Sequence, residues 1–380
     1  MKVLVAVDSF KGSMTSMEAG NAVAEGIRRA DAQAEVVVRP LADGGEGTVE
    51  ALVCGMNGEM QRMTATGPLG KPVACEYGII RATGTAVIEM SAAAGITMVS
   101  DEEKNPLYTT TYGVGEMICD AISQGCRRFI VGIGGSVTND GGVGMLQALG
   151  FGFLDKDGRQ IAQGAVGLKD LVRITDDQVI PELSQCQFRI ACDVTNVLCG
   201  DNGCSVVYGP QKGATPDMIR DMDGWLAHYA ELAQEKYPKA DARVPGTGAA
   251  GGLGFAFLSF TRAVLESGIS IVLDELKLED DMKDADVVVT GEGRLDGQTA
   301  MGKAPVGVAG LAKKFGLPVF AFSGSVTENA RACNESGIDA FFPILRGVVT
   351  LQEAMKPQNA QNNMANTVEQ VFRLWRLKTK

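Results

Sequence analysis

Short apolar runs that end in glycine-rich polar loops recur along the chain and constrain its fold more than any other feature. Val3 to Val7 is followed by a polar loop and a helical pattern, and Glu35 to Arg39 is followed by another such loop and helix. Continuous apolar, β-branched runs are typical of parallel strands that are covered on both faces. The repeated order of strand, loop and helix predicts an α/β fold with mainly parallel sheets flanked by helices.

A change of pattern predicts two domains, one inserted into the other. Residues 67–72 (GPLGKP) form a turn-rich break, after which the pattern is that of an antiparallel strand pair. The buried-strand pattern returns at Asp286, in the run DVVVT. We therefore expect a discontinuous, Rossmann-like α/β domain from residues 1–70 and 286–380, and an inserted α/β domain from residues 71–285. We expect the functional site in the cleft between the two domains.

Composition and charge argue against several classes of protein. The chain has 380 residues with 35 basic and 46 acidic side chains, which gives a formal net charge of −11. An acidic chain is a poor binder of nucleic acids and membrane surfaces, and no apolar run is long enough to span a bilayer. We therefore expect small-molecule partners, and a chain that acts as a monomer or a homodimer.

The cysteines and the single histidine limit the chemistry. The nine cysteines are odd in number, include no Cys-x-x-Cys pair and lie mostly in apolar runs. Buried free thiols in a reducing compartment are the expected state, which predicts a cytoplasmic protein. His228 lies in a predicted helix, so neither a histidine-based triad nor a histidine-rich metal site is expected.

Residues 129–144 (FIVGIGGSVTNDGGVG) have the composition of an anion site. Glycines adopt positive φ and let several backbone N–H groups point at one ligand, and a helix that follows adds the positive end of its dipole. Asn139 and Asp140 would hold a cation beside the anion. The alternative is a turn between a strand and its helix, with no ligand. The residues that we expect to bind phosphate are Gly134, Gly135, Ser136, Thr138, Asn139 and Gly141.

Charged and polar side chains follow the first two predicted strands. Asp8, Ser9 and Lys11 come directly after the first strand, and Asp43 lies in the loop after the second. Ligands of parallel sheets gather at the carboxyl ends of the strands, so these side chains are candidates for substrate binding. The alternatives are that Asp43 only caps the next helix and that Lys11 is a solvated loop lysine.

Two later apolar runs end in the same manner. Asp193 follows one of them, and Arg294 and Asp296 lie in the loop after the other. Residues 297–303 spell G-x-x-x-x-G-K, but Ala304 stands where a P-loop has the hydroxyl that binds Mg²⁺, so this loop is not a P-loop. Carboxylates, a few cations and an anion-binding loop are what phosphoryl transfer to a small hydroxylated acceptor requires.

Residues 246–251 (GTGAAG) match the G-x-G-x-x-G fingerprint of dinucleotide-binding folds. Residues 269–273 are predicted as a strand, and Asp274 then stands about where such folds place a ribose-binding acid. The fingerprint needs a strand before it, whereas residues 241–245 are polar and end in proline. Two alternatives to phosphoryl transfer are an NAD-dependent hydroxy-acid oxidoreductase that uses Gly246–Asp274, and a non-catalytic sugar-acid-binding protein.

Seven stretches in family order resemble the bacterial glycerate kinase family, typified by enterobacterial glycerate 2-kinases. They cover nearly the whole chain and are DSFK from Asp8, DGGEGT from Asp43, GGSVTNDGG from Gly134, DVTN from Asp193, QKG from Gln211, GAAGG from Gly248, and GEGRLD through GKAP from Gly291 to Pro305. The resemblance implies a two-domain α/β kinase that uses ATP and Mg²⁺ to phosphorylate D-glycerate, giving 2-phosphoglycerate.

The roles of single residues are predicted from their chemistry. Asp296 is expected to accept the proton of the substrate hydroxyl, with Asp193 as the rival and with loop capping as the alternative role of Asp296. The full assignment is Asp296, Asp193 and Lys11 as catalytic residues, Asp8, Ser9, Arg294 and Asp43 as substrate-binding residues, and Asp193 and Asp140 as metal ligands.

Overall fold

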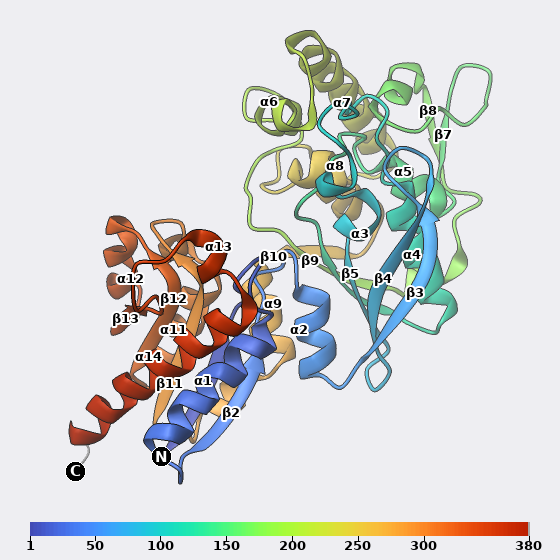
Figure 1. Ribbon diagram of the computed structural model, residues 1–380. Coiled ribbons are helices and arrows are strands. Elements are labelled where there is room, and N and C mark those ends of the chain that lie inside the picture. The colour runs from blue at the N-terminus through green and yellow to red at the C-terminus, as the bar shows by residue number, and fades with distance from the viewer. Residues whose placement is uncertain (379–380) are drawn as a thin grey trace. The chain divides into compact units, whose positions relative to one another are not determined.

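The computed structural model describes residues 1–378, and the packing of the chain divides it into two compact units. The first unit contains Met1–Asp43, Glu50–Met56 and the residues from Ile269 onward, and the second contains Gly44–Val49 and Asn57–Gly268. Each unit has its own sheet and helices, as Figure 1 shows. The predicted α/β fold with mainly parallel sheets flanked by helices is confirmed. The domain boundaries at residues 70 and 286 stay a prediction.

The first unit is built on a five-stranded parallel sheet with the order β13-β12-β11-β1-β2. Its strands are β1 (Lys2–Val7), β2 (Glu35–Pro40), β11 (Val287–Leu295), β12 (Val319–Val326) and β13 (Ala340–Pro343). Its helices are α1 (Ser16–Ala30), α9 (Gly268–Glu275), α10 (Leu278–Met282), α11 (Ala304–Lys314), α12 (Ala332–Glu335), α13 (Leu351–Ala354) and α14 (Pro357–Lys378), together with most of α2 (Thr48–Gly55).

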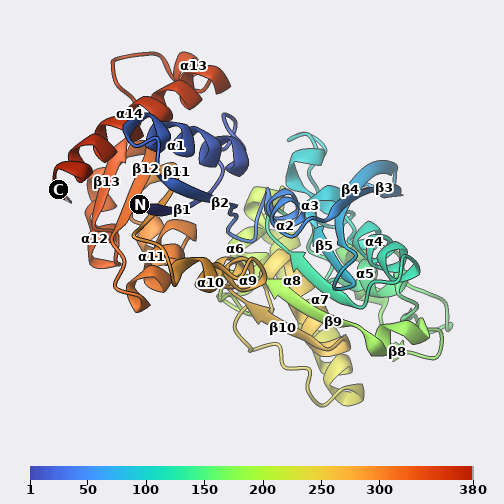
Figure 2. The ribbon, with the colours of Figure 1, turned by 90° about the horizontal axis from the view of Figure 1, so that it is seen from below.

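Helices cover both faces of this sheet, with α1 and α14 side by side on one face and α11 on the other (Figure 2). The apolar stripe of β1 packs against α1 and α14 through Val5, Val23 and Val368, all fully buried. Thr15 caps α1 by accepting from the Glu18 N–H, and the Glu18 carboxylate accepts from the Thr15 N–H. Because all five strands are parallel, their carboxyl ends meet at one edge of the sheet.

The second unit is built on a mixed six-stranded sheet with the order β10-β9-β6-β5-β4-β3. Strands β5, β6, β9 and β10 are parallel, and β3, β4 and β5 are joined antiparallel. The strands are β3 (Glu59–Thr66), β4 (Pro72–Ile80), β5 (Thr85–Glu89), β6 (Arg128–Gly132), β9 (Gln187–Ala191) and β10 (Ala263–Glu266), with a small pair β7 (Gly152–Leu154) and β8 (Arg173–Thr175). The helices are α3 (Ser91–Ala94), α4 (Tyr112–Ser123), α5 (Val143–Ala148), α6 (Cys204–Tyr208), α7 (Pro216–Lys236) and α8 (Ala249–Phe260).

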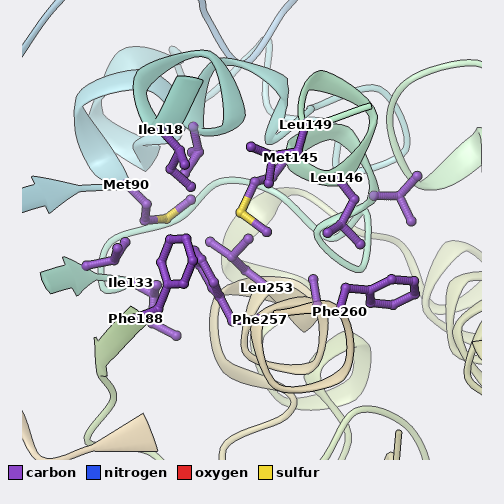
Figure 3. Close-up of a cluster of buried hydrophobic side chains, with 14 of the residues drawn as sticks. Met90, Ile118, Ile133, Met145, Leu146, Leu149, Phe188, Leu253, Phe257 and Phe260 are labelled. Carbon is purple, nitrogen blue, oxygen red and sulfur yellow. The ribbon is translucent and has the colours of Figure 1, made fainter. Parts of the chain in front are cut away.

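Apolar side chains from the sheet and from α4, α5 and α8 form the core of the second unit (Figure 3). Phe188 of β9 stacks on Phe129 of β6 with ring centroids 4.7 Å apart, and Phe257 of α8 approaches Phe188 at 5.6 Å. Aromatic contacts of this kind add stability beyond the burial of their area. Phe129 and Phe188 lie near the amino-terminal ends of β6 and β9 and hold these strands side by side, and the glycine-rich loop and Asp193 follow at the opposite, carboxyl ends.

Two local expectations were wrong. Residues 269–273 lie in helix α9 and not in a strand, because a short apolar run does not distinguish a buried strand from a buried helix. Strand β11 continues to Leu295, so residues 291–295 pair with β12 and are not a loop. Residues 59–66 pair with β4 in the sheet of the second unit. Within residues 1–378, no helix combines the length and the apolar character needed to cross a membrane.

Candidate functional site

The first unit holds a pocket of about 400 Å³ at the carboxyl edge of its sheet. Six residues that the sequence predicted, from three different segments, line it together. Glu292 and Lys303 lie there too, although neither was predicted as a site residue. Glu292 could have been found from the predicted residue Arg294. The two are separated by two positions, so in a strand that continues past residue 290 their side chains lie on the same face. The predicted residues in the pocket are Asp8, Ser9, Lys11, Asp43, Arg294 and Asp296.

Asp8 is the most buried carboxylate of the pocket, with 5% of its surface exposed. Its N–H donates to Gly291 O (2.9 Å), and its Oδ1 accepts from the Ser9 N–H (2.6 Å). Burial and, after it, the negative charge of Asp43 raise the pKa of Asp8 to about 7. A carboxyl group that titrates near neutral pH is suited to accept a proton in catalysis.

Glu292 and Asp296 are both held by the turn that contains Thr299. Glu292 accepts from the Thr299 hydroxyl (2.6 Å), and burial raises its pKa. Asp296 Oδ1 accepts from the Gln298 N–H (2.8 Å) and the Thr299 N–H (3.3 Å), while its Oδ2 lies 3.5 Å from Arg294 Nε. These contacts give Asp296 a loop-capping role, and its role as a proton acceptor stays a prediction.

Cations and apolar side chains complete the pocket. Lys11, Arg294 and Lys303 supply positive charge, and Phe10 and Met355 are among the apolar side chains that line it. The charge is therefore mixed, with three cations near Asp8, Asp43 and Glu292. Such a site can bind a small anion through its cations and accept hydroxyl protons through its carboxylates.

In the second unit, the predicted anion site is the loop between β6 and α5. Gly134 and Gly135 are exposed, whereas the loop is buried from Ser136 to Gly141. Gly135 has a left-handed backbone with φ of +73°, and a Cβ built there would meet no atom closer than 3.7 Å. The space beside Gly134 and Gly135 is therefore open to a ligand, and the backbone conformation is one that glycine favours.

Asp140 and Asp193, the two predicted metal ligands, have different surroundings. Asp140 is fully buried, and its Oδ2 accepts from the Thr111 N–H and hydroxyl, both at 2.8 Å. Its Oδ1 accepts from the Gly142 N–H (3.1 Å), so the carboxylate joins the loop to the start of α4, and burial raises its pKa. This enclosed group does not fit a Mg²⁺ ligand.

Asp193 is exposed after β9, and its Oδ1 accepts from the Gly268 N–H (3.1 Å). Mg²⁺ in kinases is commonly bound by one or two carboxylates together with substrate phosphates and water, and Asp193 fits that limited role. No group of three or more His, Cys, Asp or Glu residues in the described chain forms a complete metal site.

The G-x-G-x-x-G stretch packs against the glycine-rich loop. Gly251 O accepts from the Gly141 N–H (2.9 Å), and Gly251 has φ of +67°. A Cβ on Gly251 would lie 2.1 Å from Thr138 O, so this glycine allows the two backbones to touch. With no strand before it, and with Asp274 in helix α9, the stretch lacks the context of a dinucleotide fingerprint.

Comparison with known proteins decides the family. The model of the glycerate kinase family matches residues 3–376. The chain belongs to this family. Glycerate kinase of Haemophilus influenzae is 46% identical over 374 residues, covering 98% of both chains. Glycerate 2-kinase of Escherichia coli is 45% identical over 356 residues, covering 94% of this chain and 93% of the relative.

A solved structure agrees with this result. The crystal structure of putative glycerate kinase 2 from Salmonella typhimurium LT2 matches with a TM-score of 0.92 and 43% identity, over 100% of this chain and 99% of that one. The predicted family and the enzyme class, a phosphotransferase of the glycerate kinase family, are confirmed.

Proposed function

We propose that the protein transfers the γ-phosphoryl group of ATP to D-glycerate and forms 2-phosphoglycerate. The observation that supports this most is the pocket of the first unit, where Lys11, Arg294 and Lys303 lie near the buried carboxyl group of Asp8. Glycerate has one carboxylate for the cations and two hydroxyl groups, one of which must lose a proton. The choice of the 2-hydroxyl draws support from the name of the Escherichia coli relative, glycerate 2-kinase.

In this proposal each part of the pocket has one task. Arg294 and Lys11 neutralise the substrate carboxylate, while Ser9 and Asp43 orient the hydroxyl groups. Asp8 accepts the proton of the attacking hydroxyl, since its pKa of about 7 matches the operating range of a base better than that of an ordinary carboxylate. Asp296 remains the rival for this step.

The phosphates of ATP are assigned to the loop Gly134–Gly141 of the second unit. Its exposed glycines offer backbone N–H groups at a position with room for a ligand. Mg²⁺, held by the ATP phosphates and Asp193, would neutralise the charge that develops on the phosphoryl oxygens. The nine free thiols support the proposed cytoplasmic location.

A coupled assay for ADP release tests this function. Pure protein with MgATP is offered D-glycerate, L-glycerate, glycolate and lactate, and we expect ADP release that depends on D-glycerate. NAD and D-glycerate without ATP are expected to give no NADH absorbance. Absence of glycerate-dependent ADP in a folded preparation would remove the proposal, and NADH formation would restore the oxidoreductase alternative.

A further inference from the structure

Lys212 is a buried lysine directly beneath the glycine-rich loop. It ends a short 3₁₀ turn, Pro210–Lys212, and only 1% of its surface is exposed. Its Nζ donates to Ser136 Oγ (2.9 Å) and to Thr138 O (2.6 Å), which are both loop atoms. The ammonium group therefore contacts the loop on either side of Val137. This is the position at which the loop changes from exposed, at Gly134 and Gly135, to buried.

The burial of this charge needs an explanation. Removing an ammonium group from water costs several kcal/mol, and both hydrogen-bond acceptors of Lys212 are uncharged. Burial lowers the pKa of Lys212 to about 8, while nearby Cys204 and Asp140 act in the opposite direction. Lys212 is therefore still mostly protonated at neutral pH. A methionine of similar length would fill the same space without the cost of a buried charge.

The hydrogen bond from Lys212 determines what Ser136 can do. An ammonium group only donates, so Ser136 Oγ is the acceptor and its own proton is left for a different partner. Ser136 is 8% exposed and directly follows Gly134 and Gly135, which are both exposed. A hydroxyl that accepts from a cation is a stronger donor, because hydrogen bonds in a chain polarise one another.

We propose that Lys212 is a positioning residue that turns the Ser136 hydroxyl into a donor for a phosphate oxygen of ATP. The cation acts through Ser136 and does not itself touch the nucleotide. This inference rests on the proposed function, because it takes the loop as the phosphate site. Beyond that function, the inference assigns a role to the buried charge of Lys212. The charge holds the loop in its anion-binding form and makes the Ser136 hydroxyl a stronger hydrogen-bond donor.

A double-mutant cycle tests whether Lys212 acts on the phosphate through the hydrogen bonds of Ser136. The Kd of MgATP is measured by calorimetry for the wild type, Lys212→Met, Ser136→Ala and the double variant. A charge-assisted hydrogen bond is worth about 10- to 100-fold in affinity, so each single variant is expected to weaken binding by about that factor. The double variant should be little worse than either single variant, since both changes act on the same hydrogen bond, from the Ser136 hydroxyl to the phosphate.

Two further variants distinguish a failure of the role of Lys212 from a failure of the loop as the phosphate site. Lys239 also lies in the second unit and donates to a backbone carbonyl, Thr261 O, but its side chain is exposed. Lys239→Met therefore controls for the loss of one positive charge and should bind ATP normally. Gly135→Val should weaken ATP binding if the loop holds phosphate. Normal ATP binding by folded Lys212→Met, with weak binding by Gly135→Val, would overturn the role of Lys212 alone. Normal binding by folded Gly135→Val would remove the loop from the proposed function, and Lys212 with it.

The pH dependence of ATP binding separates a charge effect from a packing effect, including in the case that Lys212→Met fails to fold. The charged or titratable neighbours of Lys212 are Cys204, whose pKa burial raises to about 12, and the enclosed carboxyl group of Asp140. We expect the wild-type affinity to fall as pH rises through about 8, where Lys212 loses its proton. Wild-type affinity that stays constant between about pH 7 and about pH 10 would refute the inference.

Discussion

Replacing Asp8 with asparagine is expected to lower kcat by about 10²- to 10⁴-fold, the contribution of a general base. Asparagine has nearly the same shape and can still accept from the Ser9 N–H, so the strand end should keep its structure. The Kd of MgATP should change little, because the phosphates are assigned to the loop of the other unit. Steady-state kinetics with D-glycerate and calorimetry with MgATP measure the two effects.

The matched variant is Asp296→Asn. The asparagine side chain would keep an oxygen that accepts from the Gln298 and Thr299 N–H groups, so a loop-capping role predicts nearly normal kcat. If Asp296→Asn loses activity while Asp8→Asn retains it, the role of the base returns to Asp296. If both lose it, the pH profile decides, because a base with a pKa of about 7 makes kcat/KM rise through neutral pH in the wild type.

The stability of Asp8→Asn gives an independent check on the raised pKa of Asp8, because the direction of the change in the free energy of unfolding can be predicted. The pKa of Asp8 is about 7 in the fold against 3.8 as its ordinary value. Between these values the folded state keeps a proton that the unfolded state has lost, so stability falls as pH rises and is lowest above about 7. Removing the charge should therefore raise the free energy of unfolding at about pH 8, by on the order of 2–4 kcal/mol, even as activity is lost.

Gly251→Ala is expected to lower the free energy of unfolding by about 2–4 kcal/mol, from left-handed strain and overpacking together. The added Cβ would lie 2.1 Å from Thr138 O and 2.6 Å from Asn139 Cα, so the loop or the turn must move. Because the loop is assigned to ATP, affinity for MgATP should fall as well. Denaturant unfolding and calorimetry measure these changes.

Gly224→Ala is the control for this variant. Gly224 lies within α7, is exposed, and has no atom within 4 Å of a built Cβ. Alanine there should raise stability by about 0.5–1 kcal/mol, because it favours a helix interior over glycine. A Gly251→Ala protein as stable as the wild type would show that the contact between residues 251 and 138 is not needed.

The grouping of the pocket residues could be predicted from the sequence, because parallel strands place their carboxyl ends at one edge. Asp8, Asp43 and Arg294 come from separate segments, yet each follows or ends a strand of one parallel sheet. The roles within the pocket were harder to predict. The capping contacts of Asp296 were expected only as an alternative to its role as a base, and Glu292 was missed because β11 is longer than its apolar part.

The support beneath the glycine-rich loop could not be predicted at all. Lys212 lies 76 residues from Ser136 in the chain, and its burial follows only from the tertiary packing. The glycines at 246–251 were noticed for a nucleotide pattern, whereas Gly251 is needed for close backbone packing. Both observations show that long-range contacts, which local patterns do not encode, position this loop.

Phosphorus NMR of a reaction with MgATP and D-glycerate tests the central claim most directly. As ATP is consumed, we expect ADP and one new phosphomonoester resonance, split into a doublet because the phosphorylated C2 carries a single hydrogen. A triplet would place the phosphate on the CH₂ group and identify 3-phosphoglycerate, which contradicts the proposed product. ATP that stays intact, or that yields only inorganic phosphate, would contradict the transfer itself.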